Sequence, residues 1–240
     1  MSKVTAIVAT RNRPDFLFRC LLAIKLQTFE DFECIVVGDN CNFSEAVFRE
    51  FQNDQRFTYY KFVGDRPKNQ GSIAKNIAMD LSRSKYIAYC DDDNVWLPSH
   101  LRILYSEMGV IDAAYSKFYH IDYDTLPMSK MLEVDMYDIS KAKVCPLEDA
   151  LTMMHENNTV RWTPKAKLGM VHEDTDFMRR FNSSTVGKSV ITDVTAIYNQ
   201  HNFNSVMKDH SDYTEALFGL NGQTYVYPDL VAKIKEKYWR

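Results

Sequence analysis

Glycine is scarce in this chain, which has eight glycines among its 240 residues. Neither G-x-G-x-x-G nor G-x-x-x-x-G-K-[ST] occurs in it. These motifs supply the glycine-rich loops that cradle phosphates in Rossmann dinucleotide-binding proteins and in P-loop proteins. The sequence therefore argues against both classes.

Cysteine is also sparse, with five residues and no pair at the C-x-x-C spacing of a zinc or redox site. Cys20, Cys34 and Cys90 fall within apolar patterns, which is typical of small core residues. Thiols used in this way indicate a reducing compartment. We therefore expect a cytoplasmic protein and leave open a peripheral contact with a membrane.

Long apolar runs and a strong net charge are missing too. No stretch approaches the ~18 apolar residues of a membrane span, and the apolar run near residue 1 is too short for a signal peptide. The net charge of -3 argues against nucleic acid as a partner. The hydrophobic content of 45% is enough for a sizeable core, in one large domain or two small ones.

One stretch stands out among the features that are present. The apolar run from Tyr86 to Cys90 predicts a buried strand, and it leads directly into Asp91, Asp92 and Asp93. In open α/β sheets, ligands bind at the carboxyl ends of the strands. Three adjacent acids there need a positive partner, for which a divalent cation is the simplest candidate. The alternative is a solvated acidic turn.

Strands and helices alternate over the first hundred residues. Apolar runs at 4–9, 32–37 and 56–62 predict strands, and the segments between them carry helical or turn patterns. This alternation predicts parallel strands joined by crossovers. Thr10, Arg11 and Arg13 follow the first strand at a helix start, where anions are favoured, and Asp39 follows the second strand.

The second half of the chain is less regular. We predict strands at 113–119 and 189–198, a helix after Pro146, a helix that begins near Asp174 and a short amphipathic helix at 230–240. Acids at 173–176 also suit a helix start for purely structural reasons. His201 stands just beyond the last predicted strand. Residues 122–145 have no clear period.

Three motifs together resemble the GT-A-fold glycosyltransferases of family 2. These are the strand, Thr and Asn of the run from Ala6 to Arg13, the Gln-Thr-Phe and Asp-Phe-Glu pattern of the run from Gln27 to Glu33, and the acidic element from Cys90 to Pro98. The match looks closest to the spore-coat polysaccharide transferase type. It is firm over residues 1 to about 105 and thinner over 165–203.

The resemblance implies a role for each matching residue. Asp174 would be the catalytic base, and Asp93 and His201 would be metal ligands for Mn²⁺ or Mg²⁺. Trp162 and Glu173 are candidates for acceptor contacts, although a core role for Trp162 is the alternative. Two departures stand out, since Gly38 replaces an acid and Lys75 stands where an Arg is common. The donor would be bound by Thr10, Arg11, Arg13, Asp39, Gln70, Lys75, Asp91 and Asp92.

The implied fold is a mostly parallel central sheet flanked by helices, with a smaller acceptor-side subregion. Residues 1–240 would form one GT-A domain, with a nucleotide-binding half (1–105) and an acceptor-binding half (106–240). The implied activity is inverting, metal-dependent transfer of a sugar from a nucleotide-sugar donor, UDP-linked by preference, to a hydroxyl of a carbohydrate or glycoconjugate. The alternatives are a sugar-1-phosphate nucleotidyltransferase and an inactive sugar-nucleotide-binding module.

Overall fold

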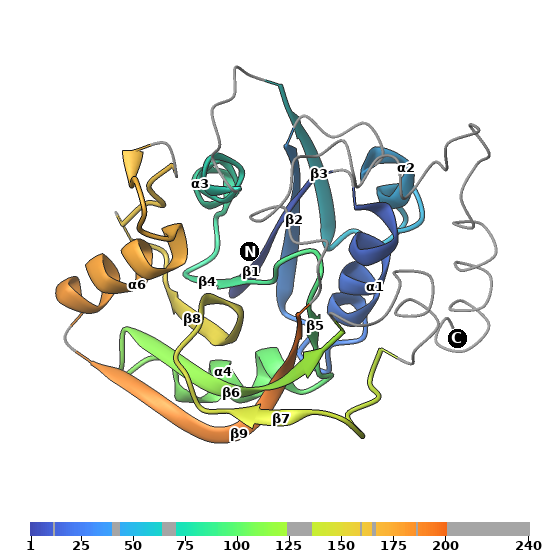
Figure 1. Ribbon diagram of the computed structural model, residues 1–240. Coiled ribbons are helices and arrows are strands. Elements are labelled where there is room, and N and C mark those ends of the chain that lie inside the picture. The colour runs from blue at the N-terminus through green and yellow to red at the C-terminus, as the bar shows by residue number, and fades with distance from the viewer. Residues whose placement is uncertain are drawn as a thin grey trace.

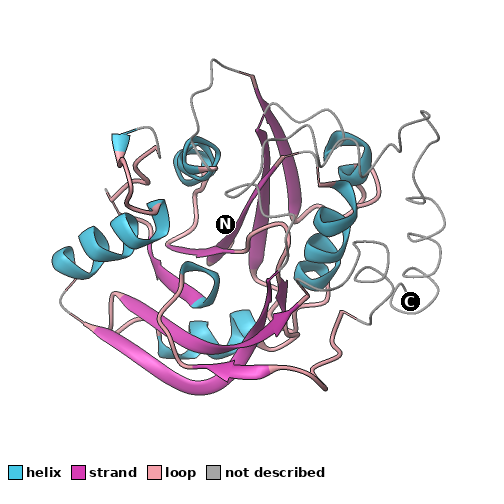
Figure 2. Cartoon of the chain, in the orientation of Figure 1, coloured by secondary structure: helices cyan, strands magenta, loops and turns pink. Residues whose placement is uncertain are grey.

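The computed structural model describes residues 1–11, 13–39, 44–63, 71–123, 136–158, 160–164, 167–185 and 187–200. A curled sheet runs through the molecule, with helices on both of its faces (Figure 1; Figure 2). The strand order is β3-β2-β1-β4-β8-β6-β9-β5, and β7 pairs with β6. Gln70, His201 and the predicted helix at 230–240 lie outside the described residues.

The first part of the sheet is parallel, as the alternating pattern predicts. It consists of β1 (Val4–Thr10), β2 (Phe32–Asp39), β3 (Phe57–Phe62) and β4 (Tyr86–Tyr89). The connections carry α1 (Pro14–Lys25), α2 (Ser44–Phe48) and α3 (Ser72–Leu81). Pro14 stands at the start of α1, where its missing N–H costs nothing. All four strands therefore end at the same edge of the sheet.

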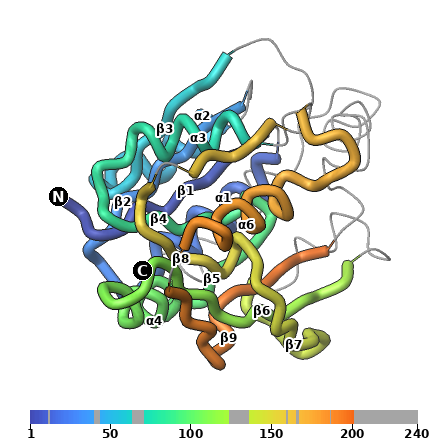
Figure 3. The backbone as a smooth tube through the Cα atoms, turned by 90° about the vertical axis from the view of Figure 1, so that its left-hand side faces the viewer, coloured from blue at the N-terminus to red at the C-terminus, as the bar shows by residue number. Residues whose placement is uncertain are grey.

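The second part of the sheet is mixed, with antiparallel pairs beside the parallel pair of β6 and β9, whereas the strands around β1 are all parallel. It is built from β5 (Val95–Trp96), β6 (Ala113–Asp122), β7 (Lys143–Cys145), β8 (Met153–Glu156) and β9 (Lys188–Gln200). β8 runs antiparallel to both β4 and β6, whereas β9 runs parallel to β6 and antiparallel to β5. Figure 3 shows β6, β7 and β9 side by side along one end of the molecule.

The prediction of a helix after Pro146 is wrong. A short 3-10 turn, η1 (Ala150–Thr152), leads directly into β8 instead. Leu151 and Met154 are buried, but they face the core from a turn and a strand. Sheet pairing has overridden the local helical spacing here, because a short apolar run fits either state. The other helices are α4 (His100–Glu107) and α6 (Glu173–Ser184), and α6 agrees with the helix predicted near Asp174.

Two hydrophobic cores lie on opposite faces of the sheet, because side chains alternate along each strand. In β1, Val4, Ala6 and Val8 pack in the core that contains α1, while Ile7 faces the other core. This second core contains residues of α3 and α6, among them Phe177. Each face of the parallel strands is thus covered by helices, which leaves the carboxyl edge as the open side.

Within the described ranges, no helix combines the length and the apolar character needed to cross a membrane.

Candidate active site

The carboxyl ends of β1, β2 and β4 bring the predicted donor-side residues together. Thr10 is the register partner of Gly38, and Cys90 donates its backbone N–H to the carbonyl of Ile7 on β1. Thr10 and Asp39 are both buried at this edge. The acidic residues that follow Cys90 therefore start at the carboxyl edge of the sheet, next to the end of β1.

The departure at Gly38 has a steric reason. A Cβ at this position would stand 2.3 Å from the Tyr59 hydroxyl and 2.6 Å from Ser44 Oγ. These two hydroxyls lie 2.7 Å apart in a hydrogen bond with each other. A carboxylate here would displace both groups, so only Asp39 of the usual acidic pair has room.

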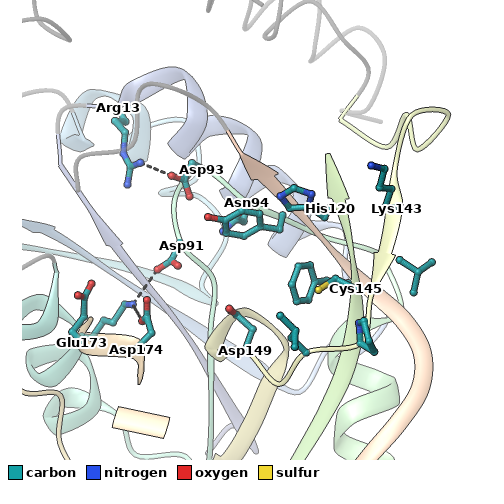
Figure 4. A pocket seen from close by; sticks show the side chains of 16 residues that line it. Arg13, Asp91, Asp93, Asn94, His120, Lys143, Cys145, Asp149, Glu173 and Asp174 are labelled. Atoms are coloured by element: carbon teal, nitrogen blue, oxygen red, sulfur yellow. Dashed lines mark hydrogen bonds and ion pairs between the residues drawn. The ribbon is translucent and has the colours of Figure 1, made fainter. Parts of the chain in front are cut away.

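The positive partners of the acidic stretch are side chains. Arg13 forms ion pairs with Asp92 and Asp93, and Lys75 Nζ lies 3.1 Å from Asp91 Oδ1 (Figure 4). This rules out the solvated acidic turn, since Asp92 is fully buried and Asp93 nearly so. The expected positive partners of the acidic stretch thus include Arg13 and Lys75, and a divalent cation stays a candidate for a further one.

Asp92 holds Arg13 and does not open onto the cavity. Burial raises the pKa of Asp92 to about 7, whereas Arg13 and the Thr10 hydroxyl act to lower it and Asp93 raises it further. Arg13 therefore has a fixed acidic anchor on one side and the more accessible Asp93 on the other.

Two asparagines fix the backbone of the acidic turn to β9. The Asn94 N–H donates to the Asp91 carbonyl, which closes the turn. Asn94 Oδ1 accepts from the Asn199 N–H at 2.9 Å, and Asn199 Nδ2 donates to the Asp93 carbonyl at 2.7 Å. Sequence reasoning missed both residues, because their partners lie more than one hundred positions away.

Lys75 brings the acidic turn and α6 together. Its Nζ lies 3.7 Å from Asp174 Oδ1 in addition to its contact with Asp91. Burial lowers the pKa of Lys75, but the charges of Asp91, Asp174 and Glu173 outweigh this effect and hold the pKa above its usual value. Lys75 is therefore a permanent cation between carboxylates.

The two acids at the start of α6 have different surroundings. Burial raises the pKa of Asp174, Lys75 opposes this, and Asp91 raises the pKa further. Glu173 is the more buried of the two, with 5% of its surface exposed, and burial followed by the charge of Asp174 raises its pKa to about 7. Both carboxylates border the same cavity (Figure 4).

This cavity has a volume of about 540 Å³ and separates the acidic turn from the second part of the sheet. Its far wall is built by β6, β7 and β9 and by residues 146–149. Among the predicted site residues within the described ranges, the following line it: Arg13, Lys75, Asp91, Asp93, Glu173 and Asp174. Thr10, Arg11, Asp39 and Asp92 are not among the lining residues.

The suggestion that Trp162 stacks on an acceptor is wrong in this structure. Its indole is 2% exposed and lies parallel to the Phe177 ring with centroids 4.1 Å apart. Lys75 Nζ stands 4.1 Å from the centroid of the same indole. Trp162 is thus a core residue that supports Lys75, which was the alternative left open above.

The family follows from sequence comparison. Residues 5–170 match the family model described as "Glycosyl transferase family 2". This chain belongs to that family. The matched residues include the acidic turn at the carboxyl edge of the sheet.

Individual relatives and solved structures agree with this. The chain is 34% identical over 126 residues to the "Uncharacterized glycosyltransferase MJ1057" of Methanocaldococcus jannaschii, which covers 50% of this chain and 42% of the relative. The structure of S. aureus TarS 1-349 in complex with UDP-GlcNAc is similar with a TM-score of 0.66 and 14% identity, over 99% of this chain and 72% of that one. The structure of the mannosyltransferase PcManGT from Pyrobaculum calidifontis, in complex with GDP-Man and Mn²⁺, is similar with a TM-score of 0.56 and 16% identity. The similarity covers 82% of this chain and 56% of that one.

These similarities establish the GT-A fold. The chain spans less than half the length of the curated relatives it matches first.

Proposed function

We propose that this glycosyltransferase moves a sugar from a UDP-linked donor to a hydroxyl group of a glycan or glycoconjugate, with inversion at the anomeric carbon and with help from a divalent metal. The observation that carries the proposal is the cavity that Arg13 and Asp93 share with Asp174. It places cationic groups and a carboxylate in one space, which a displacement of nucleoside diphosphate requires.

Asp174 is the base in this proposal. It lies at the first turn of α6, borders the cavity and has Lys75 at 3.7 Å. Asp174 removes the proton from the acceptor hydroxyl as the oxygen attacks C1 of the donor sugar, and the electron pair of the C1–O bond leaves with the diphosphate. Lys75 keeps Asp174 charged before the reaction, because it opposes the rise of the Asp174 pKa that burial causes.

Arg13 and Lys75 act on the leaving group. Both border the cavity and both are already paired with acids of the turn. A guanidinium binds diphosphate oxygens through two parallel N–H groups, and such charge-assisted hydrogen bonds stabilise the charge that develops as the bond breaks. The buried Asp92 holds Arg13 in position for this role.

The residues present fit a divalent metal held largely by the substrate. Asp93 borders the cavity and offers oxygen ligands, which Mn²⁺ and Mg²⁺ prefer. The described ranges contain no group of three or more His, Cys, Asp or Glu side chains placed to hold an ion. Mg²⁺ commonly binds through one or two carboxylates plus substrate phosphates. When bound, such an ion neutralises diphosphate charge.

Thr10, Asp39 and Asp92 remain our candidates for the nucleoside end of the donor, together with Arg11 and, outside the described residues, Gln70. His201, also outside them, stays a proposed metal ligand. The solved TarS complexes hold UDP and UDP-GlcNAc, which supports a UDP-linked donor for a chain of the same fold. The Mn²⁺ in the PcManGT complex supports the metal.

The test is a donor screen. The protein is incubated with UDP-, GDP- and dTDP-sugars in the presence of Mn²⁺ or EDTA, and release of the nucleoside diphosphate is measured. We expect release from a UDP-sugar that EDTA suppresses, and we expect inversion when the anomeric configuration of a product is read by NMR. Asp93→Asn should lower metal-dependent release by about 10²-fold or more.

Asp80→Asn is the matched control, since the exposed Asp80 pairs with Arg161 and neither residue borders the cavity. Full metal-dependent release by Asp93→Asn, or equal losses in both variants, would contradict the role of Asp93. Release of pyrophosphate in place of nucleoside diphosphate would contradict sugar transfer itself.

A further inference from the structure

The far wall of the cavity carries an aromatic row that has no part in the proposed transfer step. Tyr198 on β9 is the register partner of His120 on β6, and His120 is the register partner of Lys143 on β7. Partners in register point to the same face of a sheet. These three residues from three adjacent strands therefore form one row, and all three border the cavity (Figure 4).

A third aromatic ring broadens this row. Phe118 stands two residues before His120 on β6 and so faces the same side. Its ring centroid lies 5.9 Å from that of Tyr198, and it also borders the cavity. His120 and Tyr198 are stacked with centroids 5.6 Å apart and an angle of 15° between the rings. The wall thus offers contiguous aromatic carbon opposite the acidic turn.

The row is held in place. His120 Nε2 lies 2.9 Å from Oε1 of Gln200, which stands two residues after Tyr198 on β9. This hydrogen bond fixes the orientation of the imidazole. Both rings are only partly buried although they sit in a continuous sheet. A rigid, partly exposed aromatic surface that borders a polar cavity is suited to a ligand with one apolar and one polar face.

Asp149 stands between the row and the proposed base. One of its oxygens, Oδ1, accepts the Leu151 N–H at 2.8 Å, which orients the carboxylate at the start of η1. Burial raises the pKa of Asp149 to about 6, the Leu151 N–H lowers it, and the charges of Asp174 and Asp91 raise it. Asp149 also borders the cavity, so a hydroxyl bound there can donate to its carboxylate.

From this geometry we infer that the wall of Phe118, His120 and Tyr198, with Asp149, is the acceptor subsite, and that the acceptor group bound there is a pyranose ring. The inference rests on the proposed function for its name, since an acceptor presupposes transfer. The C–H face of the pyranose packs on the aromatic row, and one hydroxyl donates to Asp149. A neighbouring hydroxyl then points across the cavity to Asp174.

The first test measures binding and needs no turnover. Methyl pyranosides of gluco, galacto, manno, N-acetylgluco and glucurono configuration are added to the full chain with UDP and Mn²⁺, and saturation-transfer NMR reads the sugar protons. The methyl group is too small to stack by itself. We expect transfer to the C–H protons of at least one pyranoside, and loss of that signal in Tyr198→Ala and His120→Ala.

The matched variants are Tyr198→Phe, which keeps the ring, and Tyr60→Ala, which removes a tyrosine on β3 that does not border the cavity. Both should retain the signal. Thermal unfolding of each variant shows whether it is folded, and His120→Ala keeps the test decisive if Tyr198→Ala does not fold. Absence of any signal in the wild type, or an unchanged signal in folded Tyr198→Ala and His120→Ala, would overturn the inference.

The second test uses the donor that the screen identifies. Tyr198→Ala and Asp149→Asn should raise the half-saturating pyranoside concentration by about tenfold, whereas Tyr60→Ala should leave it unchanged. If the wild type does not turn over the donor but gives the saturation-transfer signal of the pyranoside, the proposed transfer is refuted and the pyranose site is not. Normal hydrolysis without any pyranoside effect would refute the site but not the donor chemistry.

Discussion

Lys75 Nζ lies 3.1 Å from Asp91 Oδ1 and 3.7 Å from Asp174 Oδ1. A single buried cation on α3 therefore joins the acidic turn after β4 to the first turn of α6. The Lys75 side chain is 5% exposed, whereas those of Asp91 and Asp174 are 37% and 47% exposed. The cost of burying the lysine is thus offset by two acids that keep part of their hydration.

The first prediction concerns this link. Lys75→Met should lower the free energy of unfolding by about 2–3 kcal/mol, because the removal of one member of a buried ion pair leaves its partners uncompensated. Activity should fall as well, since the pKa of Asp174 rises further without Lys75. Urea unfolding measures the first effect. Lys75→Arg keeps the charge and should lose less stability, so equal losses in both variants would point to packing against Trp162 instead.

The second prediction concerns Asp15, which is fully buried in the first turn of α1. Burial raises its pKa to about 6, and a hydrogen bond from its own backbone opposes this. The native state holds this proton over a pH range in which the unfolded chain has already lost it. The contribution of Asp15 to the free energy of unfolding therefore falls as pH rises from 3.8 to about 6.

Asp15→Asn should consequently raise the free energy of unfolding by about 3 kcal/mol at neutral pH. The gain should vanish below pH ~4, where Asp15 is protonated in both states. Unfolding curves of the variant and the wild type across this range test the idea, and Asp176→Asn serves as the control. Asp176 is paired with Arg180, which acts to lower its pKa, so this variant should lose stability at neutral pH.

The third prediction concerns the acid limb of the pH–rate profile. A base works only when it is deprotonated, so the raised pKa of Asp174 should move the half-maximal point of kcat/KM above ~4, the pKa of an ordinary aspartate. Asp174→Asn should lower the rate of transfer by about 10³-fold or more. Glu173→Gln should retain most of it, although Glu173 titrates near pH 7. A reversed outcome would make Glu173 the base.

The fourth prediction separates the two arginines after β1. Arg13 borders the cavity beside Asp93, whereas Arg11 is not among its lining residues. Arg13→Gln should weaken UDP binding in the presence of Mn²⁺ by about tenfold or more, because a charge-assisted hydrogen bond contributes about 1.5–3 kcal/mol. Arg11→Gln should weaken it less. Titration calorimetry gives both affinities, and equal losses would remove the specific role of Arg13.

The sequence alone determined the type and order of most elements. Runs such as Val4–Thr10 and Phe32–Asp39 are apolar strands followed by helices, and this alternation implies the parallel sheet with its carboxyl edge as the site. The acidic turn follows from the three consecutive residues Asp91, Asp92 and Asp93. These features are local: hydrophobic period and adjacency in the chain are enough to define them.

Only the tertiary structure decided which groups meet. Arg13 reaches Asp93 across 80 positions and Asn199 reaches Asp93 across 106, distances over which no periodic pattern extends. The row of Lys143, His120 and Tyr198 depends on the register between three strands, and Trp162 lies in the core because Phe177 covers it. Pairing between strands and packing between layers are set by the whole chain at once, because each contact is favourable only when the others are in place.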